Sequence, residues 1–325
     1  MAEQVMEHIY RIPVPLPGNP LKELNAYLIR GGDRDLLIDT GFRQDACREA
    51  LFAGLAEFGL GAGDVDVLLT HLHSDHSGLA PEAAGERTIY VSGVDRPSLD
   101  DLAARTAMRR EGDVRFRAEG FPADLLDSLE GRNPARAMAP PVGGRYESLA
   151  DGDVLEAGGY RLECLLMPGH TPGQMCFWLA DQGVLFTGDH VLFDITPNIT
   201  AWVGRPDSLG DYLDSLEKIR AYDPRLCLPG HRKGGDLRTR VAELLDHHRR
   251  RLDEALAVVR AHPGGTAYEL AGHMTWRIRA SSWADFPVAQ KWFAVGECMS
   301  HLDYLRLRGA VRREADGALY RYFAS

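Results

Sequence analysis

Four potential metal ligands lie within six consecutive residues: His71, His73, Asp75 and His76. They follow the apolar run 65–69, which predicts a buried β-strand. Because side chains alternate along an extended chain, His71 and His73 would leave the strand end on one face and converge on a single metal ion. Asp75 and His76 follow at a turn, where they can reach a second ion. Zinc, iron and manganese all accept such imidazole and carboxylate ligands.

Three later segments also place a potential ligand directly after an apolar strand. A Pro-Gly-His sequence ends two of these strands, at His170 and His231. Between them, Asp189 follows Phe-Thr-Gly at another strand exit. A single Pro-Gly-His would be an ordinary turn with a surface histidine. Two of them, in one chain with the cluster that begins at His71, indicate that all these residues belong to one site.

This ordered set of motifs resembles the metallo-β-lactamase superfamily. The motifs are Asp39, the His71-Leu72-His73-Ser74-Asp75-His76 sequence, His170, Asp189 and His231. The resemblance covers roughly residues 5–235 and is specific because five separate motifs occur in the family's order. It implies a four-layer αββα sandwich, in which two mixed sheets are flanked by helices and a dinuclear metal site lies at one edge.

The resemblance also implies a division of the ligands between two divalent metal ions, most simply zinc, with iron or manganese as alternatives. His71, His73 and His170 would hold the first ion. Asp75, His76 and His231 would hold the second ion, and Asp189 would bridge the two.

Two further residues receive expected roles near these ligands. Asp39 would orient the ligands through hydrogen bonds, as the outer partners of metal-binding histidines usually do. His190, directly after Asp189, is interpreted either as a proton shuttle or substrate contact, or as a structural histidine.

The chemistry of such a site is hydrolysis. Metal coordination brings the pKa of bound water from about 16 to near 7, so metal-bound hydroxide becomes available as a nucleophile at neutral pH. Asp75 would hydrogen-bond this hydroxide and accept or pass on its proton.

The elements that must position these residues alternate between strands and helices, which indicates a mixed α/β (α+β) layer architecture. Apolar runs predict strands over residues 24–30, 35–38, 65–70, 88–91, 154–156, 160–167, 174–180, 184–187 and 225–228. Helical spacing predicts helices over residues 44–58, 78–84 and 207–221. Two helix-like segments and a Pro/Gly-rich stretch interrupt this rhythm, so we interpret residues 95–144 as a helical insertion.

The remaining sequence predicts a second, smaller unit. A long helix over residues 237–261 would link it to the main body, so we expect a catalytic domain over 1–236 and a further domain over 237–325. A helix over 288–307 and a hairpin formed by 308–311 and 319–323 resemble a winged-helix tail. Such a tail occurs on a branch of the superfamily that includes β-lactamase-like endoribonucleases.

The wing carries basic residues that allow two interpretations: Arg308, Arg312, Arg313 and Arg321. They would contact phosphates if the tail binds nucleic acid. Alternatively, the tail is a packing module that closes the cleft or forms a homodimer, which is the commoner use of such a module and the interpretation we favour.

The amino-acid composition indicates the class of protein and the cellular compartment. The 325 residues include 45% hydrophobic and 26% charged residues, and the five cysteines are odd in number and scattered. Neither a secretory signal nor an apolar stretch of roughly 20 residues is visible. We therefore expect a cytoplasmic protein with reduced thiols and no membrane partner. The net charge of -10 argues against broad nucleic-acid binding.

Three functions compete at this stage. We favour a dinuclear-metal-dependent hydrolase of small thioester, ester or lactone substrates, because the stretches around His170 and Asp189 resemble those of hydroxyacylglutathione hydrolases (glyoxalase II). The predicted tail differs from the helical tail of those enzymes, so glutathione thioesters themselves are not expected. The second function is a metal-dependent endoribonuclease acting on single-stranded RNA. The third is a metal-sensing regulator that binds DNA.

Overall fold

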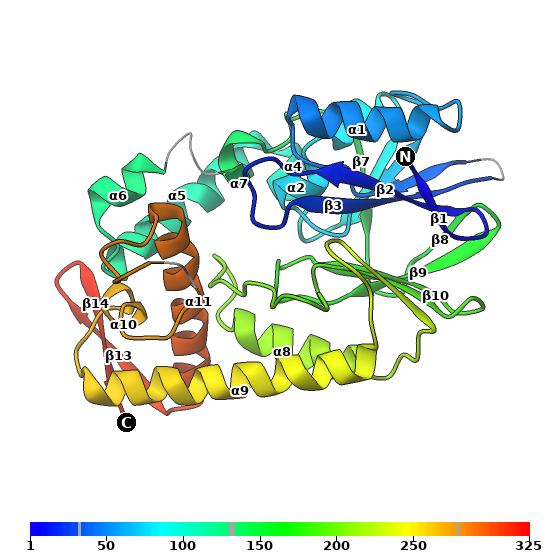
Figure 1. Cartoon of the computed structure of the whole chain (residues 1–325). Helices are drawn as coiled ribbons and strands as arrows, with labels where there is room; N and C mark the ends of the chain where they lie inside the picture. Colours follow the sequence, from blue (N-terminus) through cyan, green and yellow to red (C-terminus); the bar gives the residue numbers. More distant parts are fainter. Residues whose placement is uncertain (32–33, 130–133, 278–279) are drawn as a thin grey trace.

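The structure is a computed structural model and describes residues 1–31, 34–129, 134–277 and 280–325. The main body consists of two sheets that lie face to face between helices (Figure 1). Helix α1 (Asp45–Ala56) covers the outer side of one sheet, and α8 (Ser208–Ile219) covers the outer side of the other. This is the αββα layering that the family resemblance implies.

The first sheet contains β1 to β7 in sequence order. These strands are β1 (Glu3–Met6), β2 (Ile9–Pro15), β3 (Glu23–Ile29), β4 (Leu36–Ile38), β5 (Asp66–Leu68), β6 (Thr88–Ser92) and β7 (Arg145–Leu149). The pairings are antiparallel from β1 to β4 and parallel from β4 to β7. The short helices α2 (Ser74–Ser77) and α3 (Ala80–Ala84) follow β5.

The second sheet has the order β12-β11-β10-β9-β8. Its strands are β8 (Val154–Ala157), β9 (Tyr160–Leu166), β10 (Met175–Leu179), β11 (Val184–Gly188) and β12 (Leu226–Pro229). Only the pairing of β11 with β12, among the described strands of this sheet, is parallel.

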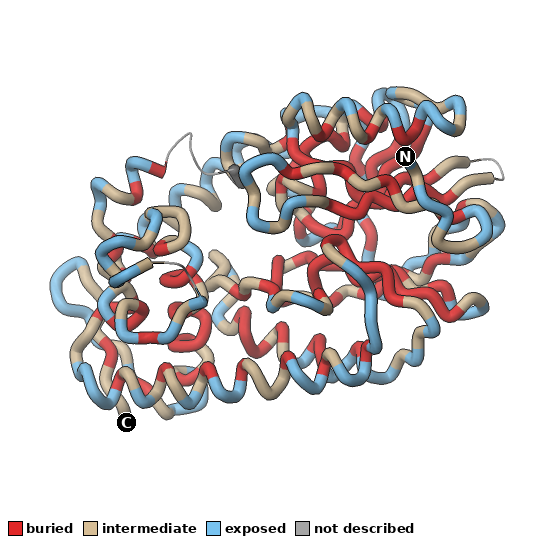
Figure 2. The backbone as a smooth tube through the Cα atoms, in the orientation of Figure 1, coloured by how far each residue is buried: buried red, intermediate tan, exposed pale blue. Residues whose placement is uncertain are grey.

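The central strands β4, β5, β6 and β11 are buried on both faces, whereas the edge strands β1, β7 and β8 are partly exposed and carry charged residues. In β3, Leu24 and Leu28 pack toward α1, whereas Tyr27 and Ile29 pack toward the second sheet. Because side chains alternate along a strand, β3 thus contributes to two separate hydrophobic clusters, one on each face of the sheet. Figure 2 shows this continuous burial through the two sheets, with exposed residues concentrated on the outer helices.

The C-terminal segment packs against the insertion. It contains α9 (Leu237–Ala261), α10 (Ala267–Ala271), α11 (Val288–Leu307) and the hairpin of β13 (Val311–Asp316) and β14 (Leu319–Ala324). Helices α4 (Pro97–Asp100), α5 (Leu102–Ala118), α6 (Ala123–Ser128) and α7 (Pro134–Ala137) make up the insertion. Phe116 and Phe121 of the insertion share one hydrophobic cluster with Val295 and Tyr322.

Most of the predicted elements are present. The long helices over 237–261 and 288–307 are confirmed at both ends. A C-terminal hairpin is present, but its first strand is Val311–Asp316 rather than 308–311, and Arg308 lies at the end of α11. Strands β1, β2 and β7 were not predicted, and the turn that carries Asp75 and His76 is the helical turn α2. Residues 130–133 of the expected insertion lie outside the described residues. The domain boundary at 236/237 and the winged-helix assignment stay predictions.

Among the described helices, none combines the length and the apolar character that crossing a membrane requires.

Candidate metal centre

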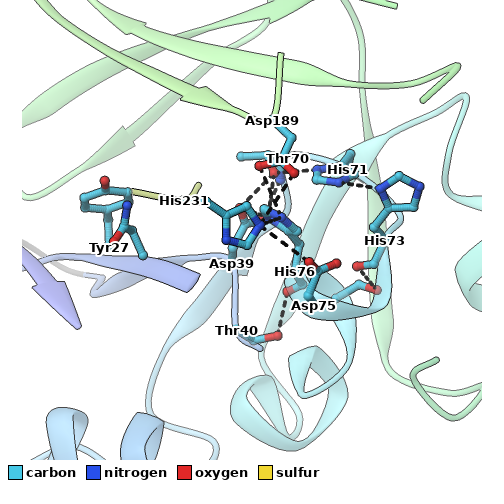
Figure 3. Close-up of polar contacts among 12 residues, drawn as sticks. Tyr27, Asp39, Thr40, Thr70, His71, His73, Asp75, His76, Asp189 and His231 are labelled. Atoms are coloured by element: carbon cyan, nitrogen blue, oxygen red, sulfur yellow. Dashed lines mark hydrogen bonds and ion pairs between the residues drawn. The ribbon is translucent and has the colours of Figure 1, made fainter. Parts of the chain in front are cut away.

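The predicted ligands leave strands of both sheets at one edge of the sandwich. Asp39 follows β4, and His71 and His73 lie between β5 and α2. Helix α2 then carries Asp75 and His76. From the second sheet, Asp189 follows β11 directly. Figure 3 shows these side chains converging from separate segments of the chain.

The Pro-Gly-His sequences have a steric reason. Gly169 has a φ of 140°, and a Cβ at this position would lie 2.4 Å from the Cβ of Tyr212. Gly230 packs directly against the site, where a Cβ would lie 2.7 Å from Oδ1 of Asp189. Glycine is therefore needed to turn the chain at one strand exit and to let the backbone approach the ligands at the other.

One group of potential ligands consists of His71, His73 and His170. Their candidate ligand atoms lie within 4.8 Å of one another. Nε2 of His71 is 3.0 Å from Nδ1 of His73, and the ring of His170 lies edge-on to both. This is the trio expected for the first metal ion.

A second group consists of Asp75, His76 and His231. The Nε2 atoms of His76 and His231 are 3.3 Å apart, and Oδ2 of Asp75 is 3.5 Å from Nε2 of His231. Asp189 lies between the two groups: its Oδ2 is 3.7 Å from Nε2 of His170 and 3.5 Å from Nε2 of His231.

Four of these histidines use Nδ1 for a protein contact, which leaves Nε2 for a metal. His71 Nδ1 lies 3.0 Å from the Thr70 hydroxyl, and His76 Nδ1 lies 2.7 Å from Asp39 Oδ2. His170 Nδ1 donates to the carbonyl of Asn198 at 3.0 Å, and His231 Nδ1 donates to the carbonyl of Glu23 at 2.7 Å. Such contacts fix the tautomer and the ring orientation of a metal-binding histidine.

The histidine pKa values differ between the two groups. Burial, followed by the proximity of His76, lowers the pKa of His71 well below its usual value. Burial is also the main cause that lowers the pKa of His73 to about 3. Burial acts in the same direction on His76, but Asp39 and Asp189 outweigh it and raise its pKa. His71 and His73 are therefore held neutral, as metal ligation requires.

The two carboxylates are held ionised. Burial raises the pKa of Asp75, but the hydrogen bond from His231 and the nearby His76 outweigh it and hold this pKa at about 2. Burial likewise raises the pKa of Asp189, but His231 and His76 outweigh it and keep this pKa below its usual range. Both side chains are thus in the form that binds a cation.

The residues fit a metal site on their own chemistry. Nε2 of His170 is buried and has no hydrogen-bond partner in the described part of the chain. A buried polar atom without a partner carries a desolvation cost that a bound ion would remove. Imidazole and carboxylate ligands match divalent transition metals but do not distinguish among them.

His190 lies apart from the ligand groups. It is fully buried, and its ring packs edge-on against Tyr212 with the ring centres 5.4 Å apart. Burial lowers its pKa to about 3. The contact with Tyr212 does not distinguish a structural role of His190 from a role with a proton or substrate, so both stay predictions.

Sequence reasoning missed Asp95, which joins two of the ligand-bearing loops. Its Oδ2 accepts hydrogen bonds from the Leu72 N–H at 3.0 Å and the Thr171 hydroxyl at 2.8 Å, and its Oδ1 accepts one from the Gly173 N–H at 2.7 Å. Burial raises the pKa of Asp95 to about 6. A carboxylate just after a strand was the available signal, because β6 ends at Ser92.

Sequence reasoning also missed Trp202. Its indole N–H donates to the carbonyl of His170 at 3.0 Å, and its ring stacks on His73 with the ring centres 5.9 Å apart. An aromatic residue in a loop carries no spacing that would predict this contact.

Comparisons with known proteins agree with this architecture. A family model described as the metallo-beta-lactamase superfamily matches residues 22–231. A metallo-beta-lactamase family protein from Thermus thermophilus has 33% sequence identity and a TM-score of 0.83, covering 99% of this chain and 100% of that one. A beta-lactamase domain protein from Burkholderia ambifaria has 26% identity and a TM-score of 0.79, with coverages of 100% and 95%.

Curated relatives align over a smaller share of their length. A lactamase-like protein of Aspergillus niger is 28% identical over 79% of this chain and 65% of its own length. An atrochrysone carboxyl ACP thioesterase of Aspergillus fumigatus is 28% identical over 76% of this chain and 64% of its own length. The alignments thus span slightly less than two thirds of these relatives. From the family match and the fold, we conclude that this chain belongs to the metallo-beta-lactamase superfamily.

Proposed function

We propose that this protein is a dinuclear-metal-dependent hydrolase of small thioester, ester or lactone substrates. The observation that carries the proposal is Asp189. Its carboxylate is 3.5 Å from Nε2 of His76 through one oxygen and 3.7 Å from Nε2 of His170 through the other. A carboxylate between two histidine groups suits a bridge between two ions better than one mononuclear site.

Different residues of this chain would contribute to different parts of the hydrolysis. Divalent ions in such a site lower the pKa of coordinated water from about 16 to near 7 and polarise a substrate carbonyl. Asp75 lies beside the predicted ligand His231 and has 13% of its side chain accessible, so it would be placed to hydrogen-bond the attacking water and to pass on its proton. Trp202 gives the side of the site next to His73 an apolar wall.

Support for an acyl substrate comes from the relatives. One of them is named a thioesterase that acts on a carrier-bound acyl group, and it is 28% identical over 76% of this chain. Thioesters and lactones share an activated carbonyl, so a site that supplies hydroxide and carbonyl polarisation serves both. We propose thioesters first, followed by esters and lactones.

The basic residues of the predicted wing do not favour the nuclease or the DNA-binding regulator. Arg308 donates to Asp207 at 2.7 Å, and Arg321 pairs with Glu269 and Asp316. Arg312 pairs with Glu314, and Arg313 lies near Glu119 and Asp303. Because each of these arginines faces a carboxylate of its own chain, little charge is left for phosphates.

Metal analysis combined with a substrate panel tests the proposal. We expect about two metal ions per chain in the wild-type protein, turnover of thioesters or lactones, and no turnover of a phosphodiester. The His73→Ala variant should lose metal and activity. His262→Ala is the matched control, because His262 stacks on His273 outside the site. Phosphodiester turnover with inert acyl substrates would favour the nuclease, and less than about one ion per chain would contradict the dinuclear site.

A further inference from the structure

We propose that α9 and α11 of the C-terminal segment position the metal ligand His170, acting through Asn198. Asn198 and Glu297 would then be positioning residues of the metal centre. The inference rests on the proposed metal site. It assigns the C-terminal segment a part in building that site, in addition to any role in substrate or partner binding.

The segment 198–202 contacts His170 at two points. The Asn198 carbonyl accepts the hydrogen bond from Nδ1 of His170 at 3.0 Å, and the Trp202 indole donates to the His170 carbonyl at 3.0 Å. Trp202 also stacks on His73, a second ligand of the same group. The orientation of the first ligand group therefore depends on where this segment lies.

Secondary structure does not hold the segment in place. Residues 189–207, between β11 and α8, contain neither helix nor strand. Instead, α11 fixes the backbone: the Ser300 hydroxyl donates to the Ile199 carbonyl at 2.6 Å, and the Ala201 N–H donates to the Gly296 carbonyl at 3.2 Å. A Cβ at Gly296 would lie 2.3 Å from the hydroxyl oxygen of Thr200, so only glycine permits this close approach.

The side chain of Asn198 is tied to a buried ion pair. Its amide nitrogen donates to Oε2 of Glu297 at 3.4 Å and to the carbonyl of Phe293 at 3.5 Å. Oε1 of Glu297 lies 3.0 Å from Nη2 of Arg251 on α9. The side chain of Glu297 is 17% exposed, and that of Arg251 is 10% exposed. Because water has little access to this ion pair, its two side chains keep a defined position. The hydrogen bond from Asn198 to Glu297 therefore holds Asn198 in a defined position as well.

Arg251 is itself held from three sides. It pairs with Glu254, donates to the carbonyl of Thr275 at 3.0 Å, and lies over the ring of Trp276 at 4.4 Å. A continuous set of contacts thus runs from the C-terminal segment through Glu297 and Asn198 to Nδ1 of His170. Outer partners of a metal-binding histidine typically change metal affinity 10- to 100-fold when they are removed.

Three variants test this inference through metal binding rather than through activity alone. Asn198→Ala keeps the backbone carbonyl that His170 uses but removes the amide that holds it. Glu297→Gln keeps an oxygen that accepts from Asn198 but loses the charge that pairs with Arg251. Glu297→Ala loses both. Arg321→Ala is the matched control, since it breaks ion pairs of the same C-terminal segment without touching residues 198–202.

The readouts are the dissociation constant of Zn²⁺ by chelator competition, the visible spectrum of the Co²⁺-loaded protein, and the melting temperature. We expect Asn198→Ala and Glu297→Ala to bind Zn²⁺ about tenfold more weakly and to show a shifted Co²⁺ spectrum. Glu297→Gln keeps the contact with Asn198 but loses the charge that pairs with Arg251 of α9, so we expect it to weaken Zn²⁺ binding by less than Glu297→Ala does.

Two results would contradict the inference, and each is distinct from failure of the proposed function. Wild-type metal affinity and spectrum in Asn198→Ala would show that Asn198 does not position His170. An equal loss of affinity in Arg321→Ala would show a general effect of destabilising the segment. A wild-type protein that binds no metal would instead overturn the proposed function on which the inference rests.

Discussion

The carboxylate of Asp39 lies 2.7 Å from Nδ1 of His76, although 37 residues separate the two in sequence. The same carboxylate accepts hydrogen bonds from the Thr70 N–H at 2.9 Å and the Thr70 hydroxyl at 2.7 Å. Asp39 itself has a φ of 58°, a left-handed conformation that Asp adopts more readily than most residues. One side chain thus joins the end of β4 to the ligands that follow β5.

The first prediction concerns this contact. Asp39→Asn retains the shape and tolerates the left-handed backbone, but it removes the charge that orients His76. We expect Zn²⁺ affinity to fall about 10- to 100-fold, measured by chelator competition. Asp66→Asn is the control, because Asp66 is buried in the same sheet but contacts Arg34 and the Thr88 N–H instead. Equal losses in both variants would contradict a specific role for Asp39.

The second prediction concerns the clamp formed by Asp95. Asp95→Asn replaces one accepting oxygen with a donor, so a buried N–H or hydroxyl of the neighbouring loops loses its partner. This change should cost about 1–3 kcal/mol of unfolding free energy and should weaken metal binding. In parallel, Thr171→Val should reproduce part of the loss, whereas Thr171→Ser, which keeps the hydroxyl, should not. Denaturant unfolding with and without metal measures both effects.

A third prediction distinguishes two arginines of α5. Arg115 pairs with the buried Glu119 and Asp303, whereas Arg117 pairs with the exposed Asp127. Arg115→Ala removes a positive charge that pairs with two buried carboxylates, so it should lower the free energy of unfolding by about 3 kcal/mol. Arg117→Ala should change stability by less than about 1 kcal/mol. Chemical denaturation measures the free energy of unfolding of both variants. An equal loss of stability in the two would refute the prediction.

The fourth prediction concerns acid sensitivity. Burial lowers the pKa of His301 to about 4, below the value of 6.5 expected in the unfolded chain. Between these values the unfolded state binds a proton that the native state does not, so stability falls as the pH falls. The loss from His301 alone should be about 2 kcal/mol between pH 7 and pH 5. His301→Phe should flatten this part of the pH profile of the melting temperature, and an unchanged slope would argue against it.

A fifth prediction addresses nucleic acid. Because the hairpin arginines face carboxylates of the same chain, binding of single-stranded RNA at physiological salt should be weaker than about 100 μM. Arg308→Ala and Arg321→Ala should leave any residual affinity unchanged. Fluorescence anisotropy over a salt series checks this, and a tight complex that these variants weaken would revive the ribonuclease interpretation.

The sequence by itself determined the candidate ligands, because each follows shortly after the end of an apolar strand. Short-range patterns also predicted α9 and α11, whose observed ends match the predicted ones. Similarly, Asp207 caps the N-terminus of α8 through a local contact, because its side chain accepts from the Gly210 N–H at 2.9 Å. In all these cases, the interactions that decide the local structure join residues that are close together in the sequence.

Only the tertiary structure decided which residues support the ligands. Asp95 meets Thr171 across 76 positions, Arg115 meets Asp303 across 188, and Asn198 meets Glu297 across 99. A buried carboxylate needs a partner, but no local pattern says which distant donor the fold will bring to it. Strand β7 was missed for a related reason: its alternation is weak, and it is stabilised by pairing with β6.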